Sequence, residues 1–438
     1  MWWALFAFAG TYLWTVLVLL LLVLGLTAIV RPRVFYGPFT LLDLSLAAWL
    51  ALAALQLVPV SPAVRLALSP ASVAVERTLR LDANAEVGRA PLSIDPANTV
   101  WALAVAVSVV LVFWSARRVL AHRSPRTILR GVAAAGLLAA PIAIVQHAMA
   151  PKLLYGYFPP GARNVIPYTP FWNRNDLATW LIMAAPLTLG YGLARIQSAY
   201  ARASAPDIES LLDPTTTWLG ASIVLMFGAL IATTSRSGLM GGLVALATFG
   251  WLARRQLPPK RRVWLYAALA AIVCAAALYG NTIALTKRFD ETVTQGVAGR
   301  SAIWEDTMVI VRNFFLTGTG IGSFRHAMLA YQRYPRDFMF NHAHNEYLQI
   351  AAEGGLMLSI PSLVAALSLL WLIVGRLRHD RSSFYWIRAG AVSGIIAVAV
   401  QSIWDTGLKL PANGVLFAVL AAIALTEPAS SAPASRRD

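Results

Sequence analysis

The sequence predicts an all-α, polytopic membrane protein of about 11–12 transmembrane helices with a long, partly helical external loop. Three observations support this fold class. The 438 residues are 58% hydrophobic and only 13% charged, with a mean hydropathy of +0.63, whereas a soluble domain carries about twice that charged fraction. Apolar runs of roughly 16 to 25 residues recur, and in lipid a helix satisfies its own backbone. The single cysteine, Cys274, lies in an apolar run, which excludes disulfides and cysteine metal sites.

The apolar runs define the expected spans. The first run, 2–30, is long for one span and short for two. We favour a break near AGTY (9–12), which gives two short helices, although tilt would also explain the length. The expected spans lie near 2–30, 40–60, 99–115, 130–148, 176–196, 217–234, 238–253, 263–279, 356–375, 384–403 and 411–426.

The linkers between these spans differ in charge, and this difference predicts the orientation. Basic residues concentrate in 31–33, 116–130, 254–263, 376–381 and the end of the chain. Basic linkers remain in the cytoplasm, so the alternating linkers are expected outside, namely 61–98, 149–175, 235–237, 280–344 and 404–410.

The same alternation predicts the domain organisation. Residues 1–279 form N-terminal transmembrane helices with external loops at 61–98 and 149–175, followed by an external loop at 280–344. Residues 345–426 form the C-terminal transmembrane helices, and 427–438 a cytoplasmic tail.

The long external loop has its own helical periodicity. VAGRSAIWEDTMVIVRNFF reads as an amphipathic helix, GTGIGSF as a turn, and the stretch around Phe324–Tyr334 as another short helical piece. A loop of this length with internal structure is usually functional. Its aromatic residues suit a position on the outer leaflet.

Three arginines lie at or near the external ends of spans, against the positive-inside trend. Arg236 in TTSRSG is flanked by Ser235 and small residues whose backbone donors suit an anion, or it is an arginine that snorkels to the interface. Arg300 begins the amphipathic helix, or is an ordinary surface charge. Arg174 precedes a span, where Asn175 could be no more than a helix cap.

A polar cluster, NHAHNEYLQIAAEGG, stands at the external mouth of the span that follows it. It contains Asn341, His342, His344, Asn345 and Glu346. A histidine serves as a general base near neutral pH, so His344 is the candidate base. A plain interface ion pair with a glutamate and a metal site are alternatives, but the histidines lack a recognised ligand spacing.

The segment HNEYLQIAAEGG resembles the signature of the O-antigen ligase and polymerase family of bacterial inner-membrane glycosyltransferases. That signature is a His followed by Asn, Ser or Gln, then about nine residues to a Gly, which here is His344-Asn345 with Gly354 and Gly355 at its end. FWNRNDLATWL, TTSRSG, GRSAIWEDT and TGTGIGSF resemble the family's other segments in the family's order. The motifs cover Phe171 to Leu358, although Leu358 stands where members often have Gly.

The resemblance implies a reaction on the periplasmic face of the inner membrane. A glycan on undecaprenyl diphosphate would be transferred to a hydroxyl acceptor, which is lipid A–core for a ligase and another lipid-linked glycan for a polymerase. Arg236 and Arg300 match the family's functional arginines, and His344 its histidine.

The chemistry of such a reaction agrees with these residue types. Guanidinium groups, including that of Arg174, would bind the diphosphate. Asn345 or Glu346 could hold the tautomer of His344, with His342, Ser235 and Asn175 in support. No metal, other cofactor or nucleic acid is expected, and membrane lipids are the remaining partners.

Two other functions share these features. A transporter or flippase of a lipid-linked anion would use the same arginines and spans, but should show charges near mid-span or paired broken helices. A protein O-oligosaccharyltransferase would share the signature and differ in its Ser or Thr acceptor. The sequence does not separate ligase from polymerase.

Overall fold

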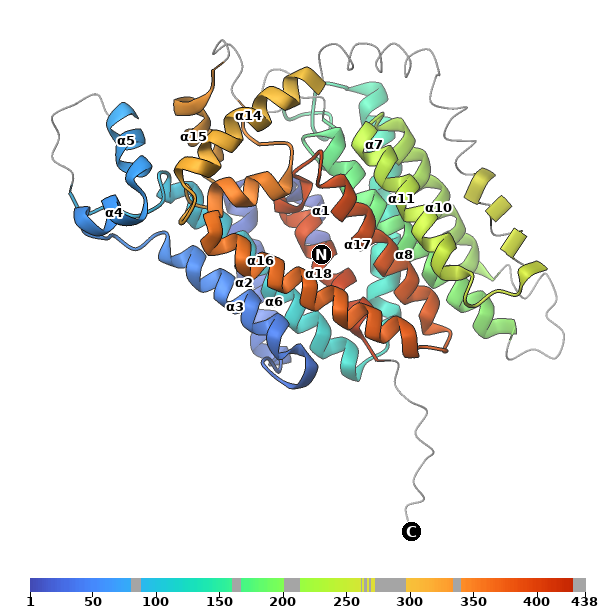
Figure 1. Ribbon diagram of the computed structural model, residues 1–438. Coiled ribbons are helices and arrows are strands. Elements are labelled where there is room, and N and C mark those ends of the chain that lie inside the picture. Colours follow the sequence, from blue (N-terminus) through green and yellow to red (C-terminus); the bar gives the residue numbers. More distant parts are fainter. Residues whose placement is uncertain are drawn as a thin grey trace.

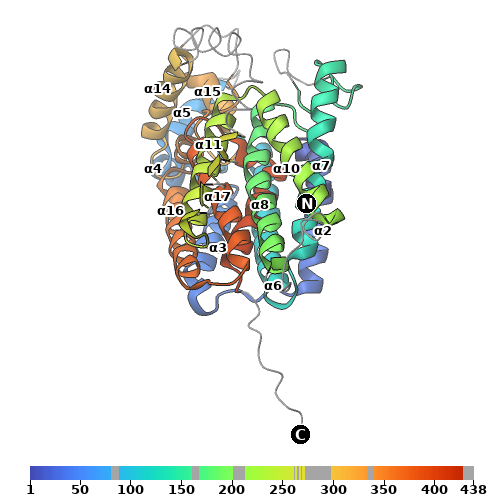
Figure 2. The ribbon, with the colours of Figure 1, turned by 90° about the vertical axis from the view of Figure 1, so that its right-hand side faces the viewer.

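A computed structural model describes residues 1–79, 88–159, 167–200, 213–260, 297–333 and 340–427, with single positions between 262 and 271. The described chain is helical and contains no strand, which confirms the all-α prediction. Figures 1 and 2 show long helices running side by side along one axis. They are α2 (Leu13–Val30), α3 (Thr40–Leu55), α6 (Pro96–His122), α7 (Arg126–Met149), α8 (Arg174–Tyr200), α10 (Pro214–Ala232), α11 (Arg236–Ala253), α16 (Glu346–His379), α17 (Phe384–Gln401) and α18 (Pro411–Leu425).

The two ends of this bundle differ in composition. At one end, which we call the basic end, α6, α11 and α16 finish and lead into the arginine-rich linkers. At the opposite end, which we call the site end, α16 begins. Short helices gather toward the site end, at the top of Figure 2. They are α4 (Pro62–Leu68), α5 (Pro70–Leu79), α14 (Val297–Asn313) and α15 (Phe324–Tyr331).

The first apolar run is broken, as expected, but not into two spans. Helix α1 (Trp2–Phe6) has five residues, and a 3-10 turn η1 (Phe8–Gly10) separates it from α2. Ala9 in this turn has a φ of 54°. A five-residue helix is about 8 Å long and cannot cross a bilayer. The expectation of two short spanning helices is therefore corrected to one span, Leu13–Val30, preceded by a short helix.

The described residues account for only part of the expected 11–12 spans. Within the described part of the chain, eight helices are long and apolar enough to cross a membrane, with α18 as a shorter apolar helix. Helix α11 lies outside this set because Arg236 begins it and several further glycine or polar positions lower its mean hydropathy. The run expected at 263–279 lies largely outside the described residues.

Helices α8 and α17 form the buried centre of the bundle, with 89% and 78% of their apolar windows buried. They approach each other closely at glycine. A Cβ atom on Gly190 would lie 2.3 Å from the carbonyl oxygen of Trp386, and one on Gly390 would lie 2.3 Å from that of Pro186. Small residues allow such backbone contact between membrane helices. This contact fixes Arg174, at the start of α8, relative to the end of α17.

The external loop follows its expected structure where it is described. Helix α14 covers the amphipathic stretch, α15 the short piece after it, and the glycine-rich segment between them is a turn. The buried face of α14 includes Ile303 and Ile310, which pack in a small apolar core with Phe324 and Met328 of α15. This second core holds α14 over the start of α16.

Candidate active site

The polar cluster His342–Glu346 enters α16 in a constrained conformation. His344 has a φ of 49°, a left-handed backbone that is uncommon outside glycine. Asn345 is the N-cap, and its Oδ1 accepts a hydrogen bond from the backbone N–H of Leu348 at 3.0 Å. Asn345 therefore uses its Oδ1 to stabilise the start of α16. The sequence analysis had offered this side chain as a group that orients His344. The backbone N–H of Glu346 donates to Ser402 O at 2.9 Å, which ties the cluster to the end of α17.

The glycine pair of the signature breaks α16 into two segments. Gly355 has a φ of 54° and a ψ of −158°, and a Cβ there would lie 2.5 Å from the N atom of Gly318. The break exposes the carbonyl of Glu353, which accepts from Gly320 N at 2.9 Å and from Gln56 Nε2 at 3.0 Å. Two glycine motifs of the sequence thus meet in space. The contact between Gly318 and Gly355 keeps the first segment of α16, which begins with Glu346, at the site end. The second segment of α16 is the span that follows.

Arg300 lies in the first turn of α14, close to the histidine cluster. One turn later, Trp304 donates from Nε1 to the carbonyl oxygen of Ala343 at 3.0 Å. Residues four apart share one helix face, so Arg300 and Trp304 face the same segment. Burial lowers the pKa of the His344 imidazole, and the charge of Arg300 lowers it further.

Arg236 begins α11 in the tight turn that follows α10. Ser235 is the N-cap of α11, where its Oγ accepts from Gly238 N at 3.1 Å. Ser237 Oγ donates to Asp405 Oδ2 at 3.2 Å, which connects this turn to the linker between α17 and α18. Arg174 donates from a guanidinium nitrogen to Thr234 Oγ1 at 3.1 Å. Arg174 and Arg236 therefore belong to one assembly of α8, the α10–α11 turn and the 402–410 linker.

Asn175 has a local role. Its backbone N–H donates to the side-chain oxygen of Asn173 at 3.0 Å, and its carbonyl accepts from Thr179 Oγ1 at 2.9 Å. These contacts organise the first turn of α8.

The sequence analysis missed the linker between α17 and α18, which carries the central charges of the site. Lys409, in the 3-10 turn η4 (Gly407–Lys409), is surrounded by the carboxylates of Glu346, Glu353, Asp176 and Asp405. Burial lowers the pKa of Lys409 to about 8, although these carboxylates raise it. The available signal was WDTGLKL, a charged pair in a linker of a few residues between two apolar runs.

The surroundings of the two histidines of the cluster lower the pKa of both, which favours their neutral form. Burial lowers the pKa of His344, and the charges of Arg300 and Lys409 lower it further, while Asp405 raises it. Burial also lowers the pKa of His342 well below its usual value, with Lys409 and His344 acting in the same direction. A neutral imidazole at neutral pH can accept a proton.

Several buried polar atoms of the cluster lack a hydrogen-bond partner within the described part of the chain. They are His342 Nδ1, His344 Nδ1, Glu346 Oε2 and Lys409 Nζ. An unsatisfied buried polar atom costs about 1–3 kcal/mol, and native proteins contain few of them. Four in one place indicate groups that are left available for a substrate. Among all residues that the structure describes, no group of three His, Cys, Asp or Glu side chains is arranged to hold a metal ion.

A cavity of about 620 Å³ opens beside this cluster. Its polar end is formed by Arg325, His342, Glu346 and Lys409, and its apolar walls come from α3, α6, α16 and α18. Arg174, Arg236, Arg300 and His344 are not among its lining residues. His342 and Glu346 therefore line the cavity, whereas the predicted arginines and His344 lie outside its lining.

Residues 221–361 match the family model described as O-antigen ligase. Residues 221–361 therefore form an O-antigen ligase segment within the chain. The matched range contains Arg236, Arg300 and His344, together with the two glycine motifs that meet at the break in α16. Arg174 and Lys409 lie outside it. No curated protein matches the chain. This family segment, together with the eight apolar helices of the described residues, supports a multi-pass membrane protein with a role in glycosyl transfer during O-antigen or polysaccharide assembly.

Proposed function

We propose that the protein transfers a glycan from undecaprenyl diphosphate to a hydroxyl acceptor on the periplasmic face of the inner membrane. The product is capped lipid A–core if the protein is a ligase, or a longer lipid-linked glycan if it is a polymerase. One observation carries the proposal: His344 Nδ1 is buried without a hydrogen-bond partner among the described residues, in a segment that matches the O-antigen ligase family model.

The reaction needs a base and a site for a departing anion. The acceptor oxygen attacks the anomeric carbon, the bond from that carbon to the diphosphate oxygen breaks, and the acceptor proton passes to His344. A base positioned in this way contributes about 10²–10⁴ in rate. A single displacement with one base predicts inversion at the sugar carbon.

The arginines supply the positive charge for the leaving diphosphate. Arg236, Arg300 and Arg174 come from three elements that meet at the site end, and a guanidinium matches phosphate oxygens in geometry and charge. Fixed charges of this kind stabilise the negative charge that grows as the bond breaks. We propose that these arginines perform this role without a metal ion.

The apolar cavity supports a lipid-linked substrate. Trp49, Trp101 and Phe417 line its walls, while Glu346 and Lys409 lie at its polar end. A cavity with this polarity suits an isoprenoid or acyl chain whose polar head reaches the cluster.

The direct test is transfer by the purified protein in nanodiscs, with a lipid-linked glycan as donor and lipid A–core as acceptor. His344→Ala should lower the rate by roughly 10²-fold or more, since the base is removed. His326→Ala is the matched control, because His326 pairs with Asp95 outside the cluster, at 2.6 Å. Near-normal transfer by His344→Ala would remove the proposed base. Activity that disappears in chelator and returns with a divalent cation would contradict the metal-free mechanism.

A deletion strain analysed on a polysaccharide gel separates the acceptors. Loss of all capped lipopolysaccharide, with free polymer accumulating, indicates a ligase. Single capped units indicate a polymerase. Loss of external polymer, with the lipid-linked glycan retained on the cytoplasmic side, would instead indicate transport.

A further inference from the structure

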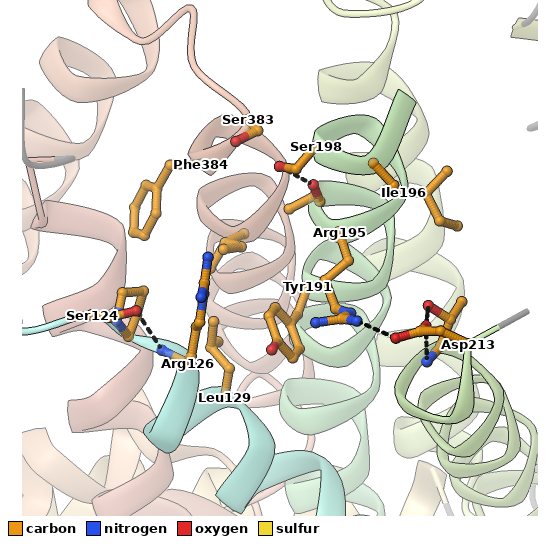
Figure 3. A pocket seen from close by; sticks show the side chains of 15 residues that line it. Ser124, Arg126, Leu129, Tyr191, Arg195, Ile196, Ser198, Asp213, Ser383 and Phe384 are labelled. Atoms are coloured by element: carbon orange, nitrogen blue, oxygen red, sulfur yellow. Dashed lines mark hydrogen bonds and ion pairs between the residues drawn. The ribbon is translucent and has the colours of Figure 1, made fainter. Parts of the chain in front are cut away.

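A second cavity, of about 490 Å³, lies at the basic end of the molecule (Figure 3). It forms where α7 and α17 begin and α8 ends, beside the N-cap of α10. Arg174 and Tyr191 are on the same helix, roughly 25 Å apart along its axis, so this cavity is remote from the histidine cluster. The proposed glycosyl transfer does not use it.

Two donors on α8 face this cavity without a partner. Tyr191 is 3% exposed, and its hydroxyl has no hydrogen-bond partner within the described part of the chain. Arg195 lies one turn later on the same face, and its Nε is also buried without a hydrogen-bond partner among the described residues. In Figure 3 the two side chains lie next to each other. A buried donor left unsatisfied is unfavourable unless a ligand or water completes it, so this pair points to an acceptor that the chain does not supply.

The charge around the cavity is positive. Asp213 is already used: its Oδ2 lies 2.6 Å from a guanidinium nitrogen of Arg195, and its Oδ1 accepts from Thr216 N at 2.9 Å. Arg126 projects from α7 between Phe384 and Tyr191 in the view of Figure 3. Two arginines thus oppose one engaged carboxylate.

The helix termini act in the same direction. Helices α7 and α17 both begin here, and neither has an acidic residue in its first turn or a hydrogen bond from an N-cap side chain. The amino terminus of a helix favours negative charge. The lining residues therefore favour an anion that accepts hydrogen bonds, which is the chemistry of a phosphate.

Part of the remaining lining is apolar, beside several serine and threonine residues. Leu129, Ile196, Phe384 and Ile387 surround the polar groups. A free phosphate would leave this surface without a partner, whereas a phospholipid places its phosphate on the donors and its chains on the apolar side chains. We propose that this cavity binds the phosphate of an anionic phospholipid, held by Tyr191, Arg126 and Arg195.

The test uses the full-length protein in nanodiscs of phosphatidylcholine, with and without phosphatidylglycerol. Native mass spectrometry measures retained phosphatidylglycerol, and thermal unfolding measures the stabilisation that it gives. Arg126→Gln removes a charged donor and Tyr191→Phe removes only the hydroxyl. Arg130→Gln is the matched control, since Arg130 is one turn from Arg126 on α7 and does not line the cavity.

We expect Arg126→Gln and Tyr191→Phe to bind phosphatidylglycerol about tenfold more weakly than the wild type, with Arg130→Gln unchanged. In phosphatidylcholine alone, Tyr191→Phe should unfold at the same temperature as the wild type or higher, because its hydroxyl has no partner to lose among the described residues. This result separates a ligand contact from a structural role.

Two outcomes would overturn the proposal. Equal retention of phosphatidylglycerol by Arg126→Gln, Tyr191→Phe and Arg130→Gln would show that the cavity does not hold the lipid. Stabilisation by inorganic phosphate that matches that of phosphatidylglycerol, with the same dependence on Arg126 and Tyr191, would show an anion site that does not require a lipid.

Discussion

At the scale of single residues, the protonation of His344 decides whether the site can act as a base. Burial and the charges of Arg300 and Lys409 lower its pKa, while Asp405 raises it. Since the neutral form is the base, activity should fall on acidification only below the ordinary histidine pKa of about 6.5. The same shift affects stability: the unfolded chain binds the proton more readily, so stability declines as pH falls through 6.5.

Substitution of Arg300 should move this acid limb. Arg300→Gln removes a positive charge near His344, so the pKa of the imidazole should rise and activity should be lost at a higher pH than in the wild type. The measurement is the pH profile of kcat/KM. Arg312→Gln, in the last turn of the same helix, is the control and should leave the profile in place. A profile unmoved by Arg300→Gln would show that Arg300 does not act on the base.

Substitution of Asp405 should shift the pKa of His344 in the opposite direction to substitution of Arg300. Asp405→Asn removes the negative charge that raises the pKa of His344, so the acid limb should move to lower pH. The hydrogen bond from Ser237 can be kept by the amide oxygen, which makes the change mainly electrostatic. Shifts of the same sign from Arg300→Gln and Asp405→Asn would contradict the assigned charge arrangement.

At the scale of elements, the break in α16 fixes where the histidine cluster lies. Gly355→Ala places a Cβ 2.5 Å from the backbone of Gly318, at a φ that side chains rarely adopt. The variant should lose roughly 2 kcal/mol or more of stability, seen as a lower unfolding temperature. Gly375→Ala is the control on the same helix, because a Cβ there meets nothing within 4 Å. Gly375→Ala should be neutral or slightly stabilising, since alanine favours the helix. Equal unfolding temperatures for Gly355→Ala and the wild type would contradict the close contact.

The elements also show how far the sequence leads. The pattern of apolar residues predicted α14 and the spans, because burial in lipid or in the core requires apolar side chains on those helix faces. Arg236, Arg300 and His344 were selected for polar chemistry at external ends of spans. Lys409 and Asp405 were missed because their importance comes from a tertiary approach to Glu346 and Ser237, which no local pattern records. The contact of Gly355 with Gly318 was hidden for the same reason: each glycine looked like an ordinary turn residue in its own segment.

At the scale of the whole molecule, the orientation of the helix bundle in the membrane decides which compartment the histidine cluster faces. The histidine cluster lies at the end where α16 begins, and the arginine-rich linkers lie where α6, α11 and α16 finish. Every long helix agrees with this alternation, which makes orientation a single property of the bundle. The positive-inside rule puts the basic end in the cytoplasm, and the proposed transfer then occurs in the periplasm.

Cysteine labelling tests this orientation directly. In a Cys274→Ser background, Tyr157→Cys places a thiol at the site end, where Tyr157 is 83% exposed. Gln256→Cys places one just after α11, at the basic end. A membrane-impermeant maleimide should reach position 157 once the outer membrane is permeabilised, and position 256 only after the inner membrane is opened. The reverse pattern would place His344 in the cytoplasm, away from a periplasmic donor. It would leave the geometry of the site intact and overturn the proposed reaction, because the cluster would then face the wrong compartment.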